Sequence, residues 1–328
     1  MAAKPRIVLR ADGDSATGLG HVYRLLAIYA MLERDYDCRF CILDPSPAVV
    51  QLIEGCGARC VPLPSARPAD LPGDAELYIL DGYAFDTTFQ RELRDRGRPI
   101  LSIDDIHAYP FLADAVVNHA PRVADHYAGL VAPERLHTGL DYAILRPEFL
   151  AAAAAPRPQP PADPATFVCF GGSDHHGISL RAAAALLDRE PGVAVHLVVG
   201  GAFRHGDALA ALQRQYATLQ VHRNLGADAL LRVMRSCTVG IAPASTILYE
   251  LIAVGLPAVS GYYVGNQERI YEGFRDLGYI VPAGNFHATP DFAALVAAAR
   301  RWVAPAESPI DGRSPERFRT LIEHLLWP

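Results

Sequence analysis

The sequence has no uninterrupted run of about 18 apolar residues, which is the length that a membrane-spanning helix needs. Its most apolar stretch, residues 247–259, is interrupted by a glutamate, a glycine and a proline. The N-terminus also lacks the long apolar segment and small-residue cleavage site of a signal peptide. These absences predict a cytoplasmic protein without a transmembrane helix.

Basic residues are not in excess. The chain carries 30 Lys and Arg against 36 Asp and Glu, which gives a formal net charge of -6. A surface that binds nucleic-acid phosphates needs clustered Lys and Arg, and the sequence contains no such cluster. We therefore expect no nucleic-acid partner.

Metal-binding patterns are weak. The six cysteines lie mostly in apolar, strand-like segments, which suit buried and reduced thiols. Cys38 and Cys41 fall in one expected strand, where positions three apart point to opposite faces and do not share a metal. Asp104 and Asp105 follow another strand without a third oxygen ligand nearby, which favours a turn or capping role. We expect neither a metal nor another cofactor.

Strands and helices alternate along the whole chain. Its 328 residues are 51% hydrophobic and 20% charged, as in globular proteins, and this length suits two domains. Short apolar runs alternate with helical patterns in the first half, which predicts a parallel sheet covered on both faces. The strands expected there are residues 6–10, 39–43, 77–81, 100–103 and 115–118.

The Ala- and Pro-rich segment 150–161 is typical of a surface linker and marks a domain boundary. We therefore predict an α/β protein with two Rossmann-like, doubly wound domains, residues 1–150 and 151–328, whose strand ends face one cleft. The final helix is a candidate for packing back on the first domain. The strands expected in the second domain are residues 166–170, 194–199, 219–222, 239–242 and 258–260.

The first candidate site lies between the first strand and the first helix. Gly18 and Gly20 allow a ligand to approach the backbone closely, and the following helix start directs NH groups at it. The third glycine of a dinucleotide fingerprint is missing, and His21 follows instead. Because imidazole exchanges protons near neutral pH, His21 is suited to act as a general base. The alternative is that it only caps or packs the helix.

Two candidate sites of the second domain also follow strands. Gly171 and Gly172 suit close approach to a phosphate or sugar, with Ser173 beside them as a ligand or a helix cap. Ser245 and Thr246 begin a helix, where hydroxyl and backbone NH groups form an anion site for a pyrophosphate. Each pattern alone is also typical of ordinary helix capping.

Further polar side chains follow strands in the same way. Glu250 comes one turn after Thr246, so its carboxylate is placed to accept two ribose hydroxyls, or is simply solvated. Asn266 opens another helix and can both donate to and accept from sugar hydroxyls, although it is also a common helix cap. Asp81 and Tyr83 end a strand of the first domain, where an ordinary turn is the alternative.

Taken together and in order, these motifs resemble the nucleotide-sugar hydrolases of pseudaminic acid biosynthesis. The matching motifs run from residue 6 to about residue 285. They are Arg10-x-Asp12, Gly18-x-Gly20-His21-x-x-Arg24, Asp81-x-Tyr83, Ile103-Asp104-Asp105, Tyr142-Ala-x-Leu145-Arg146-Pro147-Glu148-Phe149, Phe170-Gly171-Gly172-Ser173-Asp174, Ser245-Thr246-x-x-x-Glu250 and Asn266-Gln267.

The resemblance implies a fold like that of the GT-B glycosyltransferases. It also implies a reaction in which water attacks the anomeric carbon of UDP-2,4-diacetamido-2,4,6-trideoxy-β-L-altropyranose and releases UDP. His21 would be the base, with Tyr83 and Asn266 as the other active-site residues. The residues that it implies for UDP are Gly171, Gly172, Ser173, Ser245, Thr246 and Glu250. Those expected to contact the rest of the substrate are Arg10, Asp12, Gly18, Gly20, Arg24, Asp81 and Gln267.

The chain departs from the family pattern at two places. Gly82 stands where the family commonly has His between Asp and Tyr, and Pro243-Ala244 precede Ser-Thr where a glycine pair is frequent. We therefore expect a different sugar pocket on a retained fold and UDP site. The rival readings are a glycosyltransferase, in which His21 deprotonates a sugar or lipid hydroxyl, and a nucleotide-sugar binding protein without catalysis.

Overall fold

The computed structural model describes residues 3–13, 19–302, 305 and 308–328. Residue contacts divide the chain into two compact units, which we call the first and the second unit. The first unit comprises Met1–Pro147 and Arg313–Pro328, and the second comprises Glu148–Gly312. Within the described residues, no helix is long and apolar enough to span a membrane.

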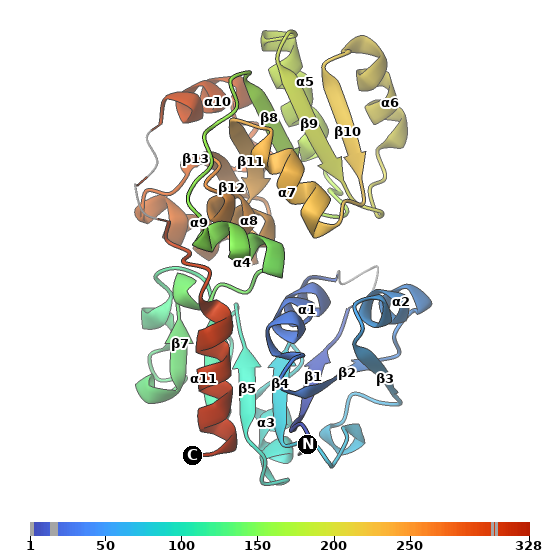
Figure 1. The fold of residues 1–328 in the computed structure, drawn as a ribbon, viewed down its shortest axis with the longest axis vertical. Coiled ribbons are helices and arrows are strands. Elements are labelled where there is room, and N and C mark those ends of the chain that lie inside the picture. The colour runs from blue at the N-terminus through green and yellow to red at the C-terminus, as the bar shows by residue number, and fades with distance from the viewer. Residues whose placement is uncertain (1–2, 14–18, 303–304, 306–307) are drawn as a thin grey trace. The chain divides into compact units, whose positions relative to one another are not determined.

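The first unit contains a parallel sheet with the strand order β3-β2-β1-β4-β5-β6-β7 (Figure 1). Every described pair of neighbouring strands is parallel. The order reverses direction between β1 and β4, so the loops that follow these strands diverge and leave room for a ligand. The strands are β1 (Arg6–Ala11), β2 (Asp37–Leu43), β3 (Arg59–Leu63), β4 (Leu77–Asp81), β5 (Ile100–Ile103), β6 (Ala115–Asn118) and β7 (Leu136–Thr138).

The helices of the first unit bury one face and leave the other in solvent. The longest are α1 (Gly20–Leu32) and α11 (Ser314–Leu326), and these two pack on each other. Ser314 Oγ donates to the carbonyl of Ala143 at 2.7 Å, which ties α11 to the body of this unit. The other described helical elements are α2 (Pro47–Gly55), α3 (Thr87–Arg94) and the short turns η1 (Pro68–Asp70), η2 (Ala124–Tyr127), η3 (Pro133–Arg135) and η4 (Leu140–Tyr142).

The second unit repeats the same winding, with the strand order β10-β9-β8-β11-β12-β13. Its described strand pairs are parallel, and its direction reverses between β8 and β11. The elements are α4 (Pro147–Ala154), β8 (Ala165–Cys169), α5 (Ile178–Arg189), β9 (Ala194–Val199), α6 (Gly206–Gln215), β10 (Leu219–Arg223), α7 (Ala227–Arg235), β11 (Val239–Pro243), α8 (Thr246–Val254), β12 (Ala258–Tyr262), α9 (Gly265–Asp276), β13 (Val281–Asn285), η5 (Phe286–Ala288) and α10 (Phe292–Arg301).

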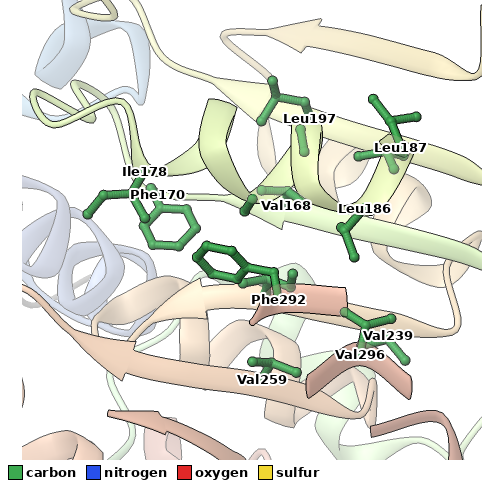
Figure 2. Close-up of a cluster of buried hydrophobic side chains, with 14 of the residues drawn as sticks. Val168, Phe170, Ile178, Leu186, Leu187, Leu197, Val239, Val259, Phe292 and Val296 are labelled. Carbon is green, nitrogen blue, oxygen red and sulfur yellow. The ribbon is translucent and has the colours of Figure 1, made fainter. Parts of the chain in front are cut away.

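A cluster of buried apolar side chains holds the strand ends of the second unit in place (Figure 2). Val168 and Phe170 come from β8 and the residue that follows it, Ile178 from α5, and Phe292 and Val296 from α10. Burying each such side chain contributes about 1.5–3 kcal/mol. The cluster therefore fixes the point at which β8 ends and the Gly171-containing loop begins.

Three strands have no counterpart among the expected ones, and each lies at an edge of a sheet. They are β3, β7 and β13, whose side chains are largely half-buried or exposed. Pro62 lies in β3, and Pro282 and Gly284 lie in β13. Edge strands tolerate these residues because one side makes no ladder hydrogen bonds, so they lack the long apolar run that marks a central strand.

The linker is shorter than expected. Residues 150–154 belong to α4, and the extended, mostly exposed segment begins only after it. Alanine is the best helix former, so the Ala run continues the helix that starts at Pro147. The expectation that the whole of 150–161 is linker was therefore wrong for its first five residues.

Candidate active site

His21 lies at the start of α1, directly after the loop that follows β1. The N-cap residue of α1 makes no side-chain capping bond, and the helix is held by its buried face, which includes Val22, Leu25 and Ile28. Because β4 lies next to β1 in the sheet, Asp81 at the end of β4 meets this helix start. His21 Nδ1 lies 2.7 Å from Asp81 Oδ1.

This contact fixes how the imidazole carries its proton. Asp81 is fully buried and its carboxylate can only accept, so Nδ1 of His21 is the donor and Nε2 is left as an acceptor. Tyr83 packs edge-on against the imidazole with ring centroids 4.7 Å apart, and it is 48% exposed. The imidazole is itself 19% exposed, so a small reactant can reach it. This is the arrangement of an oriented general base.

Arg24, one helical turn after His21, binds the same carboxylate. Its Nε donates to Asp81 Oδ2 at 2.6 Å and its Nη2 donates to Asp81 Oδ1 at 2.5 Å. Burial raises the pKa of Asp81, but the charge and hydrogen bonds of Arg24, with the hydrogen bond from His21, outweigh it and hold this pKa below its usual value. Asp81 therefore stays ionised, and Arg24 is engaged with protein carboxylates.

Arg10 and Asp12 form a separate pair in the same unit. Arg10 is fully buried, donates to both carboxylate oxygens of Asp12, and lies over the ring of Phe85 at 4.8 Å. Asp12 also accepts the backbone NH of Leu43 at 3.1 Å, which ties the end of β1 to the end of β2. In this structure both side chains brace the loop that precedes His21. Gly20 opens α1, and Gly18 lies outside the described residues.

Gly82 gives the turn after β4 its shape. Its φ is +155°, and a Cβ built on it would lie 3.0 Å from the ring of Phe85. A side chain at this position would require Phe85 to move, although Phe85 packs under Arg10. The structure thus accounts for glycine between Asp81 and Tyr83, and it leaves the space beside Tyr83 without a side chain from position 82.

Asp104 takes a structural role at the end of β5. Its carboxylate accepts the Tyr127 hydroxyl at 2.7 Å and the backbone NH of His107 at 3.0 Å. Asp105 instead turns to Arg24, whose Nη1 donates to Asp105 Oδ2 at 3.0 Å. Sequence reasoning weighed Asp105 only as a turn or metal residue. The signal that places it here is the sheet order, because β5 is the neighbour of β4.

His119, which follows β6, is a buried neutral histidine. Its Nδ1 accepts the backbone NH of Ile144 at 3.1 Å, and burial, assisted by the charge of Arg24, lowers its pKa to about 3. The unfolded chain protonates the same group near pH 6.5. The neutral ring therefore contributes stability that is complete above about pH 6.5 and is lost as the pH falls toward 3.

We predict a measurable acid dependence of stability from this one group. Between pH 6 and 4 the free energy of unfolding should fall by about 1.4 kcal/mol per pH unit, and His119→Asn should remove that slope while lowering stability at pH 7. Urea unfolding in a Trp302→Phe background, where Trp327 of the first unit is the remaining tryptophan, measures it. His324→Gln, at an exposed position of α11, should keep the slope. An unchanged slope in His119→Asn would contradict the assignment.

The glycine turn after β8 is shaped for close backbone approach. Gly171 has a φ of +80°, and a Cβ on Gly200 would come within 2.5 Å of the Gly172 Cα. Asp174 caps α5, since its carboxylate accepts the NH groups of Ile178 and Ser179 at 3.0 and 2.9 Å. A protein carboxylate thus already occupies the start of α5. Gly171 and Gly172 are exposed, and Ser173 beside them is half-buried.

The start of α8 has no side-chain cap. Ser245 is the N-cap residue in an extended conformation without a capping hydrogen bond, and Thr246, the first helical residue, is exposed. Residues 247–254 of this helix are buried, so its position in the unit is fixed. Glu250, one turn on, is 3% exposed. The exposed NH groups at this helix start suit a phosphate group.

Asn266 and Gln267 differ in their surroundings. Asn266 is the second residue of α9 and is exposed, while Val264 is the N-cap. Gln267 is 7% exposed, and its Oε1 accepts the backbone NH of Tyr263 at 3.1 Å, which closes the loop between β12 and α9. Of the predicted pair, Asn266 is therefore the one open to a ligand.

The structure brings together His21, Arg24, Asp81 and Tyr83 in the first unit, and adds Asp105 to them. Gly171, Gly172, Ser173, Ser245 and Thr246 follow β8 and β11, the two adjacent strands between which the second sheet reverses. Asn266 follows β12, the next strand. Among the described residues, no group of three or more His, Cys, Asp and Glu side chains is arranged to hold a metal ion.

Comparison with solved structures defines the fold. CalG4, the calicheamicin glycosyltransferase, superimposes with a TM-score of 0.64 at 16% identity, covering 98% of both chains. Acinetobacter baumannii MurG gives 0.62 at 14% identity, covering 98% of this chain and 99% of that one. The UDP-GlcNAc 2-epimerase of Methanocaldococcus jannaschii gives 0.62 at 9% identity, covering 97% and 99%. This chain has the GT-B fold. The fold class predicted from the sequence is confirmed.

Two curated proteins are similar to this GT-B chain in sequence. The UDP-2,4-diacetamido-2,4,6-trideoxy-beta-L-altropyranose hydrolase of Campylobacter jejuni is 27% identical over 287 residues, which cover 84% of this chain and 98% of that protein. An uncharacterized protein of Methanocaldococcus jannaschii is 21% identical over 289 residues, 82% of this chain. The chain spans only 58% of the length of that second protein. No family model matches the chain. The resemblance drawn from the motifs is confirmed as a distant sequence similarity.

Proposed function

We propose that this chain is a nucleotide-sugar hydrolase. It releases UDP from a UDP-diacetamido-trideoxyhexose by attack of water at the anomeric carbon, in the biosynthesis of a pseudaminic-type acid. The observation that carries the proposal is the His21–Asp81 pair, in which a buried carboxylate 2.7 Å from Nδ1 leaves Nε2 to accept a proton beside the exposed Tyr83. The similarity to the Campylobacter jejuni hydrolase supports the choice of substrate class.

The chemistry needs one base and one stabilised leaving group. His21 Nε2 takes a proton from water as the water oxygen bonds to the anomeric carbon, and the bond from that carbon to the UDP oxygen breaks. Tyr83 and Asn266 orient the sugar and the water. UDP leaves as an anion, so it needs no strong acid when NH groups at a helix start hold its charge. No second catalytic carboxylate is required, and no cofactor takes part.

The nucleotide half of the proposal rests on the second unit. The uncapped start of α8 at Ser245 and Thr246 receives the diphosphate, and Gly171, Gly172 and Ser173 allow it to lie close to the backbone. Glu250 accepts hydroxyls of the ribose. In the first unit, Arg10, Asp12, Arg24 and Asp81 act by shaping the base and its loop.

Incubation of the enzyme with the UDP-sugar alone tests the proposal. We expect stoichiometric release of UDP and free sugar without any acceptor, followed by NMR of the sugar and by UDP detection. UDP release that begins only when a sugar or lipid hydroxyl is added would instead identify a glycosyltransferase. A third result, tight UDP-sugar binding with no release under either condition, would identify a non-catalytic binding protein.

A further inference from the structure

Arg24 joins two carboxylates of the first unit. Its Nε and Nη2 hold Asp81, and its Nη1 donates to Asp105 Oδ2 at 3.0 Å. The same Nη2 lies 3.1 Å from Nδ1 of His21, so the guanidinium contacts the imidazole and both acids. Burial lowers the pKa of Arg24, but the charges of Asp81 and Asp105 outweigh it and raise this pKa well above its usual value. The guanidinium is permanently charged.

The charge balance of this cluster depends on Asp105. With Asp81 alone, the single positive charge of Arg24 would cancel the single negative charge next to His21. Asp105 adds a second carboxylate, 15% exposed, so the cluster carries a net negative charge when His21 is neutral. Its Oδ1 is buried and makes no hydrogen bond with any of the described residues, so no further donor disperses its charge. A net negative surrounding stabilises an imidazolium.

No other group facing His21 supplies this charge. Tyr83 packs edge-on against the ring, and Asp81 is already paired with Arg24. His119 is buried behind Arg24 and Asp105 and stays neutral at physiological pH, because burial lowers its pKa to about 3. Asp105 is thus the one carboxylate of this group whose charge Arg24 does not already balance through Asp81.

We infer that Asp105 is a positioning residue that makes His21 a stronger base, acting through Arg24. The inference deepens the proposed function, since a base that must take a proton from water benefits from a surrounding that favours its protonated form. Arg24 is then the connection between the acid and the base. It keeps Asp81 aligned on Nδ1 while Asp105 supplies the excess negative charge.

The test measures the pH midpoint at which the His21 ring titrates, by NMR of the full-length protein labelled with [15N]histidine. His21→Gln assigns the signal among the 12 histidines. Asp105→Asn removes the charge while its amide oxygen can still accept from Arg24. We expect the midpoint to fall by about one pH unit, a tenfold change in the protonation equilibrium. Asp105→Glu, which keeps the charge, should restore most of the wild-type midpoint.

A matched control separates this effect from the loss of any carboxylate. Asp125→Asn removes an exposed acid of the same unit that makes no side-chain hydrogen bond in the structure, and the midpoint should stay within about 0.3 pH units because solvent screens it. If Asp105→Asn does not fold, Asp105→Ser tests the same charge with a smaller side chain. An unchanged or raised midpoint in a folded Asp105 variant overturns the inference, as does an equal fall in Asp125→Asn.

The NMR measurement needs no substrate, so the inference and the proposed function can fail separately. If the midpoint falls but the UDP-sugar is not hydrolysed, the substrate is wrong and the inference stands. If the enzyme is active, the acid limb of the kcat/KM profile should move to lower pH in Asp105→Asn by the same amount as the midpoint. A limb that does not move shows that His21 is not the group that controls the rate.

Discussion

His21→Ala should lower the rate of UDP release from the UDP-sugar by about 10²–10⁴-fold, the usual contribution of a positioned general base. The reason is the position of its imidazole, with Nδ1 fixed by the buried Asp81 and Nε2 left to accept a proton. Alanine provides no acceptor, and water alone is a poor base. Single-turnover kinetics of UDP release measure the chemical step without interference from product release.

UDP affinity distinguishes a chemical role from a structural one. We expect UDP to bind His21→Ala as tightly as the wild type, because the proposed UDP contacts lie in the second unit. Thr246→Val, at the exposed start of α8, should do the converse and weaken UDP binding more than it slows a saturated enzyme. His324→Ala, an exposed histidine of α11, serves as the matched control and should change neither. Loss of UDP binding in His21→Ala would overturn this division of roles.

The winding of both sheets could be predicted from the sequence because buried parallel strands are continuous apolar runs. Residues 77–81 and 100–103 were expected as strands and are β4 and β5. The edge strands were missed for the opposite reason. In β13 the sequence Val-Pro-Ala-Gly-Asn has neither a long apolar run nor alternation, and its strand state comes from pairing with β12. Such pairing is a tertiary effect that local sequence does not encode.

The candidate site was predictable to the level of position but not of partnership. His21 and Asp81 were expected at the ends of two strands, and the reversal between β1 and β4 makes them neighbours. Arg24 was expected to contact substrate, whereas in the structure it is 11% exposed and paired with Asp81 and Asp105. Its partners are 57 and 81 residues away along the chain. Separations of that size are invisible to motif spacing.

Arg24→Met should be among the most destabilising single substitutions in the first unit. It leaves Asp81 fully buried without its cation, and breaking a buried ion pair by removing one partner costs about 3–5 kcal/mol. With Arg24 gone, burial alone acts on Asp81 and raises its pKa, so the carboxyl becomes protonated as the pH falls. The loss in free energy of unfolding should therefore be greatest at pH 7 to 8 and shrink toward pH 5.

Urea unfolding in the Trp302→Phe background, with Trp327 reporting on the first unit, measures this loss. The double variant Arg24→Met/Asp81→Asn should recover much of it at pH 7, because a neutral amide replaces the unpaired buried charge. Arg275→Met removes an arginine from an exposed pair with Asp276 on α9 and should leave stability nearly unchanged. If Arg24→Met costs no more than Arg275→Met, or if its cost does not shrink at lower pH, Asp81 is not the buried anion that orients His21. The base would then need another partner to fix its tautomer, and none of the described contacts of its Nδ1 other than Asp81 and Arg24 supplies one.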